Sequence, residues 1–141
     1  MADLLNPLRV IMVDDDQVDI YLTNALCKRS NLSIDFLGLN SSQALLDYID
    51  KNGTSSVDVI LVDMNMHIKN GYELVQELKT FDGLEDVTVV IFSTHEHLAK
   101  NLLAFKDEGI DFVTKPFSKK DARNFVNLLT LYHAHHHAPQ H

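Results

Sequence analysis

Residues 10–16 of the chain read VIMVDDD, an apolar run of strand length that stops abruptly at three consecutive carboxylates. A second run, VILVD at residues 59–63, has the same form and ends at Asp63. Val and Ile favour strands, and an unbroken apolar strand is typical of a sheet covered on both faces. These two segments therefore predict the centre of a parallel sheet with acidic residues at the carboxyl ends of its strands.

Further apolar runs of strand length alternate with stretches in which apolar residues recur at helical spacing. The expected strands cover residues 8–13, 33–37, 57–62, 88–92 and 110–114, and the expected helices contain residues 18–26, 45–49, 74–78, 98–105 and 122–129. The expected helix starts are Asp16, Ser41 or Ser42, and Ser118, and the expected stops are Gly53 and Gly109. This alternation predicts an α/β fold, in which helices cover both faces of a parallel sheet.

The composition is that of one soluble globular domain. The 141 residues suit a single domain, and 45% of them are hydrophobic, which is enough for a core. With 20 acidic against 12 basic residues the net charge is −8, which disfavours nucleic acid and anionic membranes as partners. The lone Cys27 cannot form an internal disulfide and is expected in the core. No signal peptide or bilayer-length apolar run is visible, so we expect a cytoplasmic protein.

The strand–helix pattern covers residues 8–132, which we expect to form one domain behind a short extension over residues 1–7. The histidine-rich tail, residues 133–141, has no core-forming pattern, and we expect it to be disordered. Weak adventitious binding of zinc or nickel is the alternative for this tail. No output domain is visible, so we expect the chain to act on a separate molecule.

Polar residues stand where four of the expected strands end. Asp14 and Asp15 follow the first strand, Asp63 the third, Ser93 the fourth and Lys115 the fifth. Ligand sites in open α/β sheets form at these carboxyl ends. Oxygen-only ligands suit Mg²⁺, a lysine supplies a point charge for phosphate, and a carboxylate can act as a nucleophile. The set predicts phosphoryl transfer to a carboxylate with Mg²⁺ as cofactor.

At these segments the sequence resembles the receiver domain of response regulators, over residues 8–132. The matching segments are Val10–Asp16, Val59–Met66 with Gly71, Val89–Ser93 and Phe112–Pro116. The resemblance implies a flavodoxin-like (βα)5 three-layer sandwich whose parallel sheet has the strand order 2-1-3-4-5. It also implies a role in two-component signal transduction.

The resemblance implies a role for each residue of the set. Asp63 would be the phosphoacceptor, and Asp14, Asp15, Asp63 and the backbone carbonyl of Asn65 would bind Mg²⁺. Lys115 would bind the phosphoryl group, and the Lys115–Pro116 peptide would be cis. The domain would catalyse its own aspartyl phosphorylation and dephosphorylation.

The resemblance further implies a switch and its partners. Ser93 would bond the new phosphate and Phe112 would turn inward, which alters the face of the fourth helix, fifth strand and fifth helix. The phosphodonor would be a sensor histidine kinase or a histidine phosphotransfer protein, and a downstream protein would read the altered face. The same resemblance allows a homodimer through the fourth and fifth helices.

Three residues depart from the usual family pattern. His67 stands where Pro is usual, Asn70 where Asp is frequent, and Thr94 where a smaller residue is common. We expect a changed loop after Asp63 but intact chemistry. Asn65, Thr94 and His95 are candidates for tuning the lifetime of the phosphate.

Two other hypotheses remain open at this point. Asp14 to Val18 also fits the Asp-x-Asp-x-Val start of haloacid-dehalogenase-like phosphatases, in which Asp14 would be the nucleophile and Asp16 the acid/base. The second hypothesis is a receiver-like binding module that is not phosphorylated, and His67 and Thr94 would support it.

Overall fold

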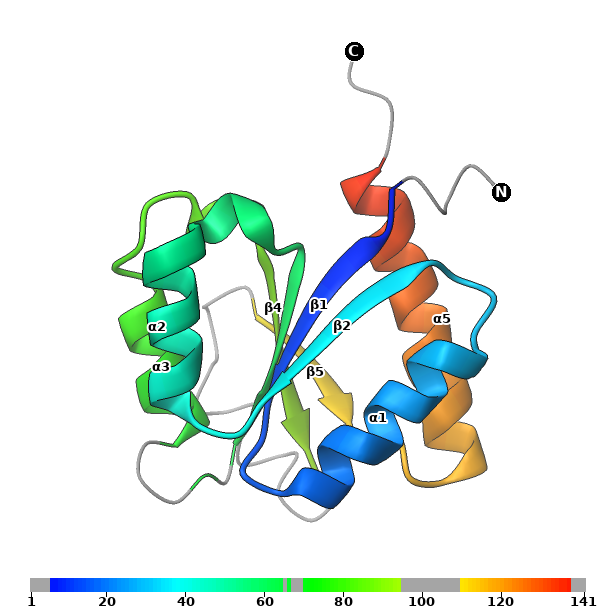
Figure 1. The fold of residues 1–141 in the computed structure, drawn as a ribbon. Helices are drawn as coiled ribbons and strands as arrows, with labels where there is room; N and C mark the ends of the chain where they lie inside the picture. Colours follow the sequence, from blue (N-terminus) through cyan, green and yellow to red (C-terminus); the bar gives the residue numbers. More distant parts are fainter. Residues whose placement is uncertain (1–5, 65, 67–69, 95–109, 138–141) are drawn as a thin grey trace.

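The computed structural model describes residues 6–64, 66, 70–94 and 110–137 (Figure 1). Five parallel strands form one sheet in the order β2-β1-β3-β4-β5, which confirms the predicted flavodoxin-like order. The strands are β1 (Leu8–Val13), β2 (Ile34–Leu39), β3 (Val59–Asp63), β4 (Thr88–Ser93) and β5 (Asp111–Thr114). The inner position of β1 and β3 explains why these two strands are almost wholly apolar.

Helices cover both faces of the sheet. They are α1 (Gln17–Arg29), α2 (Ser42–Asn52), α3 (Gly71–Leu78) and α5 (Lys119–His136), with short 3₁₀ turns η2 (Thr54–Ser56) and η3 (Leu84–Asp86). In Figure 1, α1 and α5 lie on one side of the sheet, and α2 and α3 on the other. The expected helix within 98–105 and its stop at Gly109 lie outside the described residues. Of the helices that are described, none is long and apolar enough to cross a membrane.

The core lies in two layers because successive strand residues point to opposite faces. Ile11 and Val13 pack on the side of α2 and α3, whereas Val10 and Met12 pack on the side of α1 and α5. Cys27 is buried in the second layer, as expected, and burial raises the pKa of its thiol to about 12. Each strand therefore helps to fill both halves of the core.

Side-chain caps start the helices where the sequence predicts them. The carboxylate of Asp16 accepts a hydrogen bond from the backbone N–H of Val18, at 2.9 Å. Ser41, rather than Ser42, caps α2, and Ser118 caps α5. Such caps satisfy backbone N–H groups that lack a partner in the first turn. The expected stop at Gly53 is also observed, with φ at +82°.

The carboxyl end of α5 corrects one prediction. Disorder was expected from residue 133 onward, but α5 continues to His136. Tyr132 is buried and donates a hydrogen bond to Asp111 Oδ2 at 2.6 Å, and Thr88 Oγ1 lies 3.0 Å from His136 Nε2. These tertiary contacts hold the last turns of the helix against the sheet, which a search for apolar periodicity does not reveal.

Candidate functional site

The ends of β1 and β3 bring three carboxylates together. Val13 pairs with Val62, so Asp14 and Asp63 leave adjacent strands at the same edge of the sheet. Asp14 is 0% exposed, Asp63 is buried and Asp15 is half-buried. One oxygen from each of the three carboxylates lies within 4.8 Å of the others. Backbone register therefore brings Asp63 beside Asp14 and Asp15, which are distant from it in sequence.

The ammonium group of Lys115 lies against this cluster. Its Nζ donates to Asp14 Oδ2 at 3.1 Å and to Asp19 Oδ2 at 2.7 Å, and it lies 3.3 Å from Asp63 Oδ1. The backbone N–H of Lys115 donates to the carbonyl of Ser93 at 3.0 Å, which fixes the start of the side chain at the end of β4. Lys115 is thus held both at its backbone and at its charged end.

The peptide bond after Lys115 corrects a second prediction. A cis bond was expected before Pro116, but the structure has no cis bond among the residues described. Trans is the more stable isomer of an X–Pro bond, and the turn is closed here by a hydrogen bond from Phe117 N to the carbonyl of Lys115 at 2.9 Å. The lysine reaches the acidic cluster from this trans backbone.

Crowding of charge at the site shows in the pKa values. Burial raises the pKa of Asp14 from 3.8 to about 7, and the charge on Asp63 adds to this rise. The backbone N–H of Asp16 and the ammonium of Lys115 act in the opposite direction without cancelling it. Burial alone would lower the pKa of Lys115, but Asp19, Asp63 and Asp14 together raise it above its usual value. The cluster carries more negative charge than one lysine balances.

The donor set fits a hard divalent cation. The three grouped side chains offer oxygen atoms alone, which suits Mg²⁺ or Mn²⁺ better than metals that prefer nitrogen or sulfur. A cation among the carboxylates would favour the ionised form of Asp14, whose pKa burial raises and the charge on Asp63 raises further. Residues and electrostatics therefore point to the same class of ligand.

Two residues with hydroxyl groups stand at the carboxyl end of β4, Ser93 as its last residue and Thr94 directly after it. Ser93 is buried, and its Oγ donates to the carbonyl oxygen of Thr94 at 3.1 Å. The Thr94 hydroxyl is buried and has no hydrogen-bond partner within the described part of the chain. Because β4 pairs with β3, with Phe92 opposite Asp63, both hydroxyl-bearing residues stand just beyond the strand end that carries the acid.

The remaining predicted residues are only partly described. Phe112 is half-buried on β5 and packs against the core layer of α2 and α3. Asn65, His67 and His95 lie outside the described residues. Asn70, one of the departures from the family pattern, caps α3: its Oδ1 accepts from Glu73 N at 2.9 Å. An Asp could form the same cap, so this departure preserves the local structure.

A close backbone contact explains a glycine of the site. A Cβ at Gly71 would come within 2.9 Å of the Asp63 carbonyl oxygen and 3.0 Å of Met64 Cα, both backbone atoms. The N–H of Gly71 donates to the carbonyl of Met64 at 3.1 Å. Gly71 therefore allows α3 to begin directly against the residues that carry the central carboxylate.

Sequence reasoning missed Asp19, which makes the shortest of the three contacts to Lys115. An acid in the first turn of a helix is normally explained by the helix dipole, and no pattern links it to a lysine 96 residues away. One signal was available, because residue 19 stands one helical turn after Asp16 and Asp15, near the same sheet edge.

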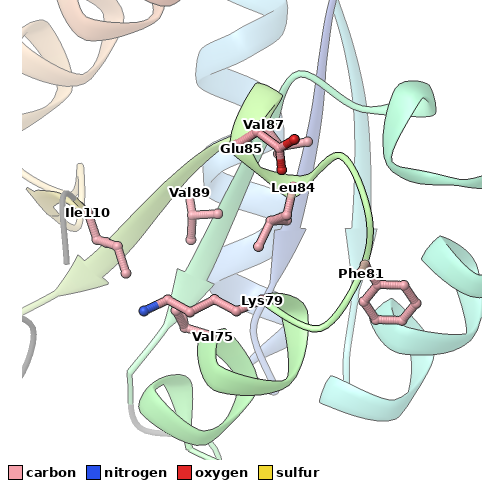
Figure 2. A pocket seen from close by; sticks show the side chains of 8 residues that line it. All are labelled: Val75, Lys79, Phe81, Leu84, Glu85, Val87, Val89 and Ile110. Carbon is pink, nitrogen blue, oxygen red and sulfur yellow. The ribbon is translucent and has the colours of Figure 1, made fainter.

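A pocket lined by both apolar and charged side chains lies away from these carboxylates. It measures about 350 Å³. It is lined by residues of α3, η3 and β4 and of the segments that connect them, and by Ile110. Figure 2 shows Val75, Leu84, Val89 and Ile110 around it, with the chain of Lys79 along one side.

The chain is similar in sequence to curated response regulators. The response regulator Rcp1 of Synechocystis sp. (strain ATCC 27184 / PCC 6803 / Kazusa) is 27% identical over 132 residues, which cover 89% of each chain. The two-component response regulator ORR1 of Oryza sativa subsp. japonica is 24% identical over 124 residues, or 84% of this chain and 54% of that protein. The chain thus spans about half the length of that relative.

Solved structures of response regulators have the same fold as this chain. A response regulator receiver domain protein from Clostridium thermocellum superposes with a TM-score of 0.66 at 25% identity, covering 88% of this chain and 98% of that one. The Mn²⁺-bound form of Rcp1 gives a TM-score of 0.69 at 23% identity, covering 87% and 91%. The family model of the response regulator receiver domain matches residues 10–127. The chain belongs to the receiver domain family of two-component response regulators.

Proposed function

We propose that the chain accepts a phosphoryl group on Asp63 from a sensor histidine kinase or a histidine phosphotransfer protein, in a magnesium-dependent reaction. The observation that carries the proposal is the grouping of Asp14, Asp15 and Asp63 with the ammonium of Lys115 against it. Nothing else among the described side chains gathers acidic oxygens in this way. The same grouping is what phosphoryl transfer to a carboxylate needs.

Mg²⁺ would be held by the side chains of Asp14, Asp15 and Asp63, together with the backbone carbonyl of Asn65. Rcp1, a relative of this chain, has been crystallised in an Mn²⁺-bound form, which supports a divalent cation here too. Bound at these residues, the cation would offset the charge that develops on the phosphoryl oxygens.

The Asp63 carboxylate is the nucleophile in this scheme. One of its oxygens attacks phosphorus in line with the bond to the donor imidazole, so that a P–O bond forms as the P–N bond breaks. The bonding pair of that P–N bond leaves with the imidazole nitrogen. Lys115, 3.3 Å from Asp63 Oδ1, donates to a phosphoryl oxygen and stabilises the charge in the transition state. Hydrolysis of the acyl phosphate by water at the same site restores Asp63.

The new phosphate changes the partners of Ser93. In the unphosphorylated state its hydroxyl donates to the Thr94 carbonyl, and we infer that it turns to a phosphoryl oxygen instead. Phe112, which is half-buried on the neighbouring strand, would turn further inward. A downstream protein, or a second copy of the chain, would then read the face of β5 and α5, together with the helix expected within residues 98–105, in the cytoplasm.

Intact mass after treatment with acetyl phosphate tests the proposal, with and without Mg²⁺. We expect the wild type to gain one phosphate only with Mg²⁺, and Asp63→Asn to gain none. Asp16→Asn is the matched control, because Asn also caps a helix and Asp16 lies beside the site. This control should be labelled like the wild type.

Two other outcomes would contradict the proposal. Labelling that persists in Asp63→Asn but disappears in Asp14→Asn would support the phosphatase-like alternative. No labelling of the wild type, either by acetyl phosphate or by a phosphorylated histidine phosphotransfer protein, would support a binding module without phosphorylation.

A further inference from the structure

The contacts of Lys115 are divided between two kinds of carboxylate. Asp14 and Asp63 belong to the acidic cluster at the ends of β1 and β3, where the carboxylate oxygens lie close enough together to bind one metal ion. Asp19 comes from the first turn of α1. Among the described residues, the cluster consists of Asp14, Asp15 and Asp63 and does not include Asp19. Its contact with Lys115 is nevertheless the shortest, at 2.7 Å against 3.1 and 3.3 Å.

A bound dication would change this balance. It would draw the oxygens of Asp14 and Asp63 toward itself and would repel the lysine ammonium. The two cluster contacts of Lys115 would then weaken together. The contact with Asp19 would remain, because that carboxylate is held by another element and takes no part in the cluster.

Lysine needs such a restraint more than arginine would. Its ammonium is a compact charge on a flexible stem, and holding it in one place has a substantial entropic cost. The Lys115 side chain is only 12% exposed and that of Asp19 16%, so water screens their ion pair less than it would at the surface. The pair is therefore placed to keep the ammonium inside the site.

We propose that Asp19 is a positioning residue, which keeps the Lys115 ammonium beside Asp63 while Asp14 and Asp63 bind a divalent cation. The inference rests on the proposed function, since it assumes that a cation binds at the acidic cluster. Asp19 lies outside the acidic cluster and would act through its contact with Lys115.

Chemical reactivity of the lysine tests this without any phosphodonor. Lys115 acetylation by an amine-reactive ester is followed by peptide mass mapping, with and without Mg²⁺, and the exposed Lys119 serves as the internal reference. In the wild type we expect Mg²⁺ to change Lys115 reactivity little. In Asp19→Asn, which keeps the shape but removes the charge, Mg²⁺ should accelerate Lys115 acetylation about fivefold, the scale of one contact between charged neighbours.

Two variants complete the design. Asp19→Glu restores a carboxylate and should return the response toward that of the wild type. Asp50→Asn removes the same charge from the exposed face of α2 and should leave Lys115 unaffected. Circular dichroism shows whether each variant is folded.

Calorimetry with Mg²⁺ alone separates the possible failures. If the wild type binds Mg²⁺ but the magnesium response of Lys115 is the same in Asp19→Asn, the positioning role is wrong and the proposed function stands. If the wild type binds no Mg²⁺, both this role and the magnesium-dependent function are wrong.

Discussion

At the scale of single residues, Asp14 shows how burial beside a second carboxylate disfavours the charged form of an acid. It is fully buried, it lies beside Asp63 in the cluster, and the N–H of Asp16 and the Lys115 ammonium compensate it only in part. Burial therefore raises the pKa of Asp14 to about 7. A carboxyl group that keeps its proton near neutral pH is a cost to a protein without metal, and a cation that binds its ionised form removes that cost.

This shift predicts a specific dependence of stability on pH when a chelator removes metal. The unfolded chain loses the Asp14 proton near pH 4, whereas the folded protein keeps it up to about pH 7. Between these values the folded state binds more protons, so the free energy of unfolding falls as pH rises, by at most about 1.4 kcal/mol per pH unit. Urea unfolding from pH 5 to pH 8 should show this fall in the wild type relative to Asp14→Asn. Parallel curves for the two proteins would contradict the assignment.

At the scale of elements, α3 shows why the site loop needs its own anchor. The helix has eight residues and begins at Gly71, directly against the backbone of Asp63. Asn70 and Glu73 form a reciprocal capping box, in which each side chain accepts a hydrogen bond from the backbone N–H of the other residue. The cap thus fixes where the chain turns after the acidic cluster.

Removing this cap should destabilise the domain without removing the chemistry. Asn70→Ala should lower the free energy of unfolding by about 1 kcal/mol, the usual effect of losing a helix cap, whereas Asn70→Asp should leave it nearly unchanged. Urea unfolding of both variants, with labelling by acetyl phosphate as a second measurement, checks this. Equal losses of stability in the two variants would mean that the amide itself, rather than the cap, is needed.

Local sequence patterns predicted the helices and strands well, but they did not predict contacts between segments that are distant in sequence. Strand β1 has the predicted bounds, and the caps at Asp16 and Ser118 were correct, because burial and capping leave local signatures in sequence. The Lys115–Asp19 pair was missed because its partners are 96 residues apart. The last turns of α5 were missed for the same reason, since contacts with β4 and β5, not apolar periodicity, hold them.

At the scale of the whole molecule, a buried aspartate at the amino ends of the strands and one at their carboxyl ends have opposite pKa shifts. Asp58 stands just before β3, at the opposite end of that strand from Asp63. Its carboxylate accepts three hydrogen bonds from Arg9, from the backbone N, Nε and Nη2 at 2.8 to 3.2 Å. Burial alone would raise the pKa of Asp58, but Arg9 outweighs it and lowers the pKa. This edge is electrostatically satisfied, whereas the opposite edge leaves negative charge for a ligand.

This difference predicts opposite effects on stability for two similar substitutions, Asp58→Asn and Asp14→Asn. Asp58→Asn leaves Arg9 without its charged partner, and because the Arg9 side chain is 42% exposed, water softens the loss to about 1–2 kcal/mol of stability. Its labelling by acetyl phosphate should match that of the wild type. Asp14→Asn should instead keep or raise stability in chelator at neutral pH and slow Mg²⁺-dependent labelling. Urea unfolding and intact mass on both variants decide the matter. If Asp58→Asn slowed labelling while remaining folded, the two edges would be coupled, and the amino edge of the sheet would belong to the functional machinery as well.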